Sequence, residues 1–113
     1  MSIKGGSYAR FRRALDSGDL AAVRLAALEL PYVDLADALA VCLLMRQQGD
    51  ERFERAGVRW LARLSLERPE IKLAELQQAA ADLAELPSAR ARADLADLSD
   101  RLHLPALGRV LRN

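Results

Sequence analysis

The chain has 113 residues, of which 51% are hydrophobic and 29% are charged, and its formal net charge is +1. This composition excludes general disorder, and the near-neutral charge excludes a protein whose whole body attracts nucleic acid or an anionic membrane. The single cysteine excludes an internal disulfide scaffold, so we expect a cytoplasmic protein.

Prolines and glycines divide the chain into segments of helical length. Glycine suits the left-handed conformation that ends a helix, an aspartate after it can cap the next helix, and proline cannot continue one. The segments between these breaks are rich in Ala, Leu and Arg, which favour helices. The sequence therefore predicts about seven helices, over residues 7–17, 20–30, 35–48, 51–68, 71–86, 89–103 and from Pro105 onward.

The N-terminal residues 1–6 carry two glycines and no apolar run. They are expected to be a flexible N-terminus, and not a signal peptide, ahead of a single all-helical domain over 7–113. The bias towards Ala, Arg and Leu is also typical of proteins from high-GC bacteria, so we expect a bacterial origin.

The predicted helix 35–48 is apolar on all sides between Ala38 and Met45. A helix of this kind must be covered by neighbours, so we expect it to be the central helix. The apolar run is too short to span a bilayer, which takes about 20 residues. Cys42 lies within the run, where a cysteine packs as a small hydrophobic residue and is not reactive.

The predicted helix 51–68 has one apolar stripe that includes Phe53, Trp60 and Leu64 at helical spacing. Gly57 lies within this stripe and weakens the helix by roughly 1 kcal/mol relative to alanine. The sequence suggests that Gly57 is tolerated because helix 35–48 approaches closely at that point.

Arginines recur at three- or four-residue spacing along one flank of the same helix. Four guanidinium groups in a row can bind phosphates or an acidic partner. The alternative is a solvated face in which Glu51 pairs with Arg55 and Glu67 pairs with Arg63. The stripe is a candidate interaction surface and consists of Arg52, Arg55, Arg59 and Arg63.

The predicted helices 71–86 and 89–103 carry narrow apolar stripes that suit an antiparallel hairpin. The expected stripe of the first is Leu73, Leu76, Ala80 and Leu83, and that of the second is Ala91, Leu95, Leu98 and Leu102. With a faint internal repeat near the period of helical-hairpin proteins, these stripes predict an all-α fold. It would be a compact bundle or a short solenoid of helical hairpins.

An acidic stripe occupies another side of the predicted helix 89–103. Carboxylates at this spacing can bind a hard cation, but such sites usually add carbonyl ligands from a wrapping loop, so a solvated face is favoured over a metal site. The stripe has the opposite sign to the arginines of helix 51–68, so the two could steer a partner or pair between subunits. It completes the candidate interaction surface with Asp94, Asp97 and Asp100.

The C-terminal residues resemble the helix-turn-helix of bacterial repressors. Leu98, Ser99, Leu102 and Leu104 have the spacing of its first helix and turn, with His103 where that family usually has glycine. The resemblance implies nucleic-acid contacts from Arg101, Arg109 and Arg112. The alternative, which the sequence favours, is a short capping helix that packs onto the bundle through Leu107, Val110 and Leu111.

Catalytic chemistry has little support in the sequence. There is one histidine and one cysteine, and we find no nucleophile–base arrangement, no metal-ligand spacing and no glycine-rich phosphate loop. His103 is expected to interact with a helix dipole. We therefore expect no catalytic residue, no cofactor and no metal.

The leading hypothesis is a non-enzymatic module that binds another protein, or its own copy, through a helix face. The alternative is a small bacterial DNA- or RNA-binding regulator that uses the helix 51–68 arginines, the C-terminal segment, or both. It requires these arginines to form one continuous basic face with Arg10, Arg12 and Arg13.

Overall fold

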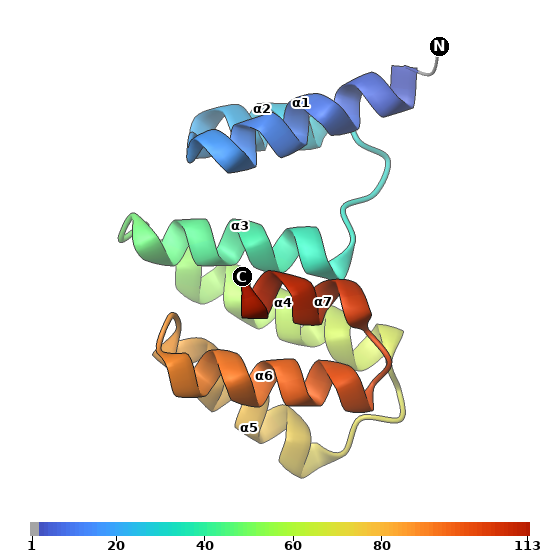
Figure 1. Cartoon of the computed structure of the whole chain (residues 1–113), viewed down its shortest axis with the longest axis vertical. Coiled ribbons are helices and arrows are strands. Elements are labelled where there is room, and N and C mark those ends of the chain that lie inside the picture. Colours follow the sequence, from blue (N-terminus) through green and yellow to red (C-terminus); the bar gives the residue numbers. More distant parts are fainter. Residues whose placement is uncertain (1–2) are drawn as a thin grey trace.

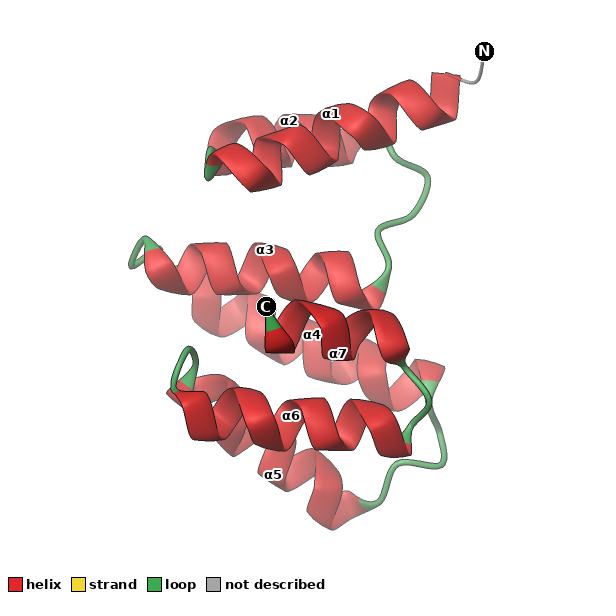
Figure 2. Ribbon diagram, in the orientation of Figure 1, coloured by secondary structure: helices red, strands yellow, loops and turns green. Residues whose placement is uncertain are grey.

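The computed structural model describes residues 3–113, and every regular element within them is a helix (Figures 1 and 2). The predicted all-α fold with seven helices is confirmed. The helices are α1 (Ile3–Ser17), α2 (Leu20–Leu28), α3 (Leu35–Gln47), α4 (Phe53–Glu67), α5 (Leu73–Glu85), α6 (Ala89–Arg101) and α7 (Pro105–Arg112).

The helices form three stacked hairpins, α1–α2, α3–α4 and α5–α6, and α7 folds back against α3 and α6 (Figure 1). Helix α3 contacts α1, α2, α4 and α7. No residue between Leu35 and Met45 is exposed. The expectation that this helix is central is therefore confirmed, and its uniformly apolar sequence is explained by neighbours on several sides.

The breaks between helices follow the chemistry read from the sequence. Gly18 and Gly49 have φ angles of +75° and +65°, in the left-handed region where a side chain is disfavoured. The Asp19 carboxylate accepts a hydrogen bond from the backbone N–H of Ala22, which caps α2. Asp34 caps α3 in the same way, through the backbone N–H of Asp37.

The first helix begins at Ile3 and not at the predicted Ser7, so it runs through both glycines of the N-terminal segment. Met1 and Ser2 lie outside the described residues. The flexibility of residues 1–6 and the single domain over 7–113 stay predictions.

The apolar interior has two parts, and we name the regions around them the N-terminal hairpin (α1 and α2) and the body (α3–α7). The body cluster includes Leu39, Trp60, Leu64 and Leu95. The hairpin cluster is smaller, and its buried members are Phe11, Ala14 and Val23. The two clusters meet at α3, because Val41 and Leu44 pack against the hairpin cluster as well as the body, and Leu20 of α2 belongs to the body cluster.

Polar contacts also join the N-terminal hairpin to α3. Asp37 is buried in α3, and its carboxylate accepts one hydrogen bond from the Tyr8 hydroxyl and one from the Arg12 guanidinium, both at 2.9 Å. Burial and the neighbouring carboxylate of Asp37 raise the pKa of Tyr8. At the other end of α3, the Gln48 side chain donates to the carbonyl of Gly18. The hairpin is thus held at both ends of the central helix.

Two details of the predicted packing are wrong. The buried face of α5 consists of Ala79, Asp82 and Leu83, whereas Leu73 is 74% exposed. The prediction was wrong because the buried face of α5 includes an aspartate, and a pattern of apolar residues at helical spacing does not include it. Gly57 is buried, yet a Cβ built on it meets nothing within 4 Å, so no close helix approach explains it.

The close approach occurs instead between α6 and α7. A Cβ on Gly108 would lie 3.1 Å from the Ser99 hydroxyl and 2.7 Å from the Arg112 guanidinium. Within the described residues, none of the helices has the length and apolar character needed to cross a membrane.

Candidate interaction surface

Two of the four α4-flank arginines are used within the fold. Arg52 pairs with Asp50 at 2.6 Å, in the turn before α4. Arg63 pairs with Glu67 at 3.1 Å, as predicted, and its guanidinium lies over the Tyr32 ring, 5.2 Å from the centroid. These two arginines therefore hold local structure.

Arg55 and Arg59 behave differently. Both are exposed, and among residues 6–113, whose side chains the structure describes, neither makes an ion pair or a side-chain hydrogen bond. The predicted pair between Glu51 and Arg55 is not formed, because α4 begins at Phe53 and Glu51 lies in the turn before it. Two adjacent positive charges on α4 are thus left for solvent or a partner.

Apolar side chains lie between and beyond these two arginines. Val58 is 68% exposed and Leu66 is 80% exposed, and Ala62 between them is exposed as well. At about 100° of rotation per residue, these side chains and the two arginines fall within roughly 100° of the helix circumference. We name this surface the α4 face, and it consists of Arg55, Val58, Arg59, Ala62 and Leu66.

The acidic stripe of α6 does not combine with the α4 face. Asp100 pairs with Arg112 of α7 at 2.6 Å, and this guanidinium lowers the pKa of the Asp100 carboxyl. Asp94 lies 4.0 Å from Arg90 in the same helix. Asp97 is exposed, and with Gln78, Arg90 and Asp94 it lines an open polar hollow between α5 and α6. Two members of this stripe are therefore already paired with arginines of the same chain.

A buried carboxyl group that the sequence pattern did not reveal lies beside this hollow. Asp82 of α5 is only 2% exposed, and its carboxylate accepts a hydrogen bond from Gln78 at 3.1 Å. Burial raises the pKa of Asp82, the Gln78 hydrogen bond opposes that shift, and the nearby negative charge of Asp94 adds to it. The available signal was its spacing, because Asp82 lies three residues after Ala79 and four before Leu86, which are both buried.

The C-terminal segment adopts a helix, a turn and a helix, with His103 in the left-handed conformation at φ 58°. Leu107 and Leu111 of α7 are buried in the body cluster and Val110 packs against it, as the capping-helix alternative predicted. Arg101 is paired with Glu75, and Arg112 with Asp100. Only Arg109 of the three predicted nucleic-acid contacts has no ion pair among the described residues.

The arginines of α1 do not extend this basic surface. Arg10 pairs with Glu29 of α2, and Arg12 pairs with the buried Asp37. Arg13 is exposed. Helix α1 packs against α2 and α3 at one end of the stack and does not contact α4 or α7 (Figure 1). The structure therefore does not join the basic residues of α1 to those of α4 and α7.

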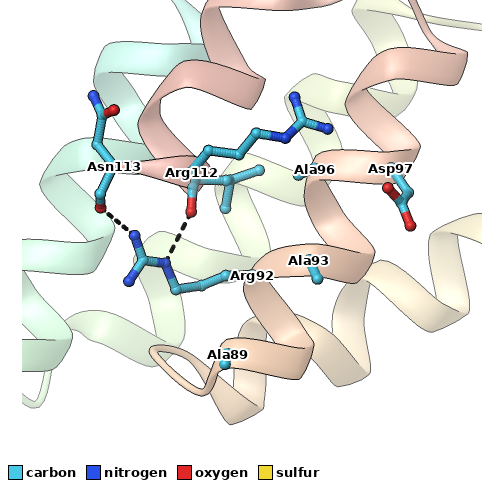
Figure 3. A pocket seen from close by; sticks show the side chains of 8 residues that line it. Ala89, Arg92, Ala93, Ala96, Asp97, Arg112 and Asn113 are labelled. Atoms are coloured by element: carbon cyan, nitrogen blue, oxygen red, sulfur yellow. Dashed lines mark hydrogen bonds between the residues drawn. The ribbon is translucent and has the colours of Figure 1, made fainter.

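A shallow hollow lies where α6 meets the end of α7 (Figure 3). Its floor includes Ala93 and Ala96, and Arg92 reaches across from α6 to the end of α7. The Arg92 guanidinium donates to the carbonyl oxygen of Leu111 at 2.9 Å and also to that of Asn113. Terminal helix carbonyls have no partner in their own helix, so Arg92 fastens α7 to α6.

The two side chains with the most versatile chemistry are placed apart. Cys42 is buried in α3, and burial raises the pKa of its thiol to about 11. His103 is exposed in the turn between α6 and α7. Within residues 3–113, no group of three or more His, Cys, Asp or Glu side chains is arranged to hold a metal ion.

Comparisons of the chain with protein-family models, with curated proteins and with solved structures gave no significant match.

Proposed function

We propose that the protein is a non-enzymatic interaction module that binds another protein through the α4 face. The observation that supports this proposal most directly is that Arg55 and Arg59 have no partner among the described residues. They also lie beside the exposed side chains of Val58 and Leu66. Single exposed apolar residues are ordinary on a protein surface. Apolar side chains interleaved with unpaired arginines on one rigid helix have the mixed character of a recognition surface, where arginine is enriched.

Nucleic-acid binding is the second candidate, and it is favoured by the exposed side chains of Arg55, Arg59 and Arg109. We rank it lower because the α4 face contains apolar side chains, which gain nothing from a phosphate backbone, and Glu54 is exposed on the same helix. The ion pairs of Arg101 and Arg112 would also have to be broken. We also propose that the protein is an adaptor that works in the bacterial cytoplasm.

The test is site-specific photocrosslinking in the cells that produce the protein. A photoreactive amino acid replaces Val58 in one variant and Leu73 in a matched control, since both side chains are well exposed. We expect a discrete protein adduct at position 58 and none at position 73. Equal labelling at the two positions, or no protein adduct at position 58, would contradict the proposal.

Fluorescence anisotropy with duplex DNA and single-stranded RNA across a salt series decides between the two candidates. Binding at micromolar concentration that weakens steeply with salt would favour the regulator, because each phosphate contact releases counterions. Flat curves at physiological salt would leave the protein-binding proposal standing. The Arg55→Glu/Arg59→Glu double variant is the control for contact through α4.

A further inference from the structure

The α4 face has a definite relief along its length. Val58, Ala62 and Leu66 follow one another at four-residue intervals, so they form a single ridge along the helix. The small Ala62 makes a low point in this ridge between two larger side chains. From Arg55 to Leu66 the face is roughly 16 Å long, or about three helical turns.

From this relief and its charges we infer that the α4 face binds an amphipathic acidic helix of a partner protein. The inference rests on the proposed function and names the chemistry of the partner. Ridges at four-residue spacing pack into the grooves of another helix, and the low point at Ala62 admits a bulky apolar side chain from the facing helix. Glutamate or aspartate side chains beside that apolar residue would pair with Arg55 and Arg59.

Charge complementarity commits this surface to an acidic occupant. Arginine presents a planar fork that matches a carboxylate, and two arginines at four-residue spacing match carboxylates one turn apart on a partner helix. Pairing with carboxylates would also remove the repulsion between Arg55 and Arg59 that the free protein carries. Glu51 and Glu54 lie towards the N-terminal end of this helix, so they disfavour an acidic segment that extends beyond Arg55 in that direction.

The acidic stripe of the same chain is a poor occupant. Asp100 is held by Arg112, and Asp94 lies beside Arg90. Asp97 alone of the three has no ion pair among the described residues. Through this stripe, a second copy would thus offer one available carboxylate to two arginines, so the stripe does not favour self-association.

The experiment selects binding helices from a random pool, so the natural partner need not be identified first. A display library of two-helix scaffolds, with the outward positions of one helix randomised, is selected against the immobilised full-length chain. Selected sequences are made as labelled peptides, and their affinities are measured by fluorescence anisotropy. We expect apolar residues at three- and four-residue spacing, flanked by glutamate or aspartate, and affinity that falls with added salt.

Matched variants locate the binding site. We expect Arg55→Glu/Arg59→Glu to weaken binding by at least about tenfold, and Leu66→Asp to do the same. The control for charge is Arg13→Glu/Arg109→Glu, which makes the same change in net charge at exposed positions elsewhere. The control for the apolar change is Leu73→Asp. A peptide with its acidic residues replaced by lysine should regain affinity for the Arg55→Glu/Arg59→Glu variant.

The outcomes separate this inference from the proposed function. Selected helices without acidic residues, or equal affinity for the wild type and the α4-face variants, would overturn the acidic-helix inference. Failure to enrich any helix would overturn it as well. The crosslinking result at position 58 then stands by itself as the test of the broader proposal.

Discussion

The N-terminal hairpin and the body are stabilised in different proportions by apolar burial and by polar contacts. The body buries large side chains from all five of its helices in one cluster. The hairpin buries mainly Phe11, Ala14 and Val23, and it reaches α3 partly through the carboxylate of Asp37. A region with a small cluster and few anchoring contacts can open without the rest of the fold. The difference identifies the hairpin as the first part of the molecule to open.

The largest effect is expected from a cavity in the body. Leu64 of α4 is 1% exposed, and Leu64→Ala should lower the free energy of unfolding by about 3–4 kcal/mol. Because Leu64 belongs to the continuous cluster, amides of α3–α7 should lose exchange protection together. Urea unfolding and amide hydrogen exchange measure the two quantities. Loss of protection confined to α4 would contradict a single body.

A cavity in the hairpin should act locally. Phe11 is fully buried, and Phe11→Ala should lower the opening free energy of α1 and α2 by about 3 kcal/mol. The body keeps its own core, so amides of α4–α6 should retain most of their protection in hydrogen exchange. If protection falls equally in all helices, the hairpin is not a separate unit.

The polar anchor should have a smaller effect. Asp37→Asn retains an acceptor for the Tyr8 hydroxyl but loses the charge that attracts Arg12, so the hairpin should become easier to open by about 1–2 kcal/mol. The control is Glu29→Gln, whose partner Arg10 is half exposed and whose effect should stay within about 0.5 kcal/mol. Equal effects of the two changes on amide hydrogen exchange in α1 would show that Asp37 does not anchor the hairpin.

The body also contains a buried carboxyl group, Asp82, whose charge we expect to destabilise the fold. Asp82→Asn removes a charge from a buried site and should stabilise the protein by about 1 kcal/mol at pH 7. The pKa of Asp82 is raised in the folded state, so folding favours its protonated form and the wild type recovers this loss as the pH falls through the raised value. The advantage of the variant should therefore shrink towards pH 4 in urea titrations. A pH-independent difference would indicate a change in packing.

The smallest effects should come from two alanine substitutions of opposite sign. Gly57→Ala places a methyl group where nothing lies within 4 Å, so it should stabilise α4 by up to about 1 kcal/mol. Gly108→Ala pushes a methyl group against the buried Ser99 and should destabilise by about 1 kcal/mol. Thermal unfolding of both variants measures these shifts. The same sign for both would mean that helix propensity outweighs the contact with α6.

The helices were predictable because the signals that end them are local. Gly18, Gly49 and the prolines determine backbone conformation at their own positions, and the structure follows them closely. The buried face of α5 was not predictable from an apolar pattern, because Asp82 is part of it.

The candidate surface was predictable only in part, because distant residues decide which charges are already paired. Arg101 pairs with Glu75 from another helix, and Arg63 lies against Tyr32 from the segment between α2 and α3. A sequence shows that arginines share a helix flank, but it does not show which of them the fold neutralises. The restriction of the surface to Arg55 and Arg59 therefore required the structure.

The buried Cys42 gives the protein a reporter of its own dynamics. Its thiol lies in the body cluster, so a thiol reagent can reach it only after that cluster opens. Its pKa of about 11 also leaves little reactive thiolate near neutral pH. Opening of the hairpin alone removes only Leu20 from the buried members of this cluster, and the rest belong to the body. The labelling rate of this one native atom would therefore time the opening of the body without any introduced probe.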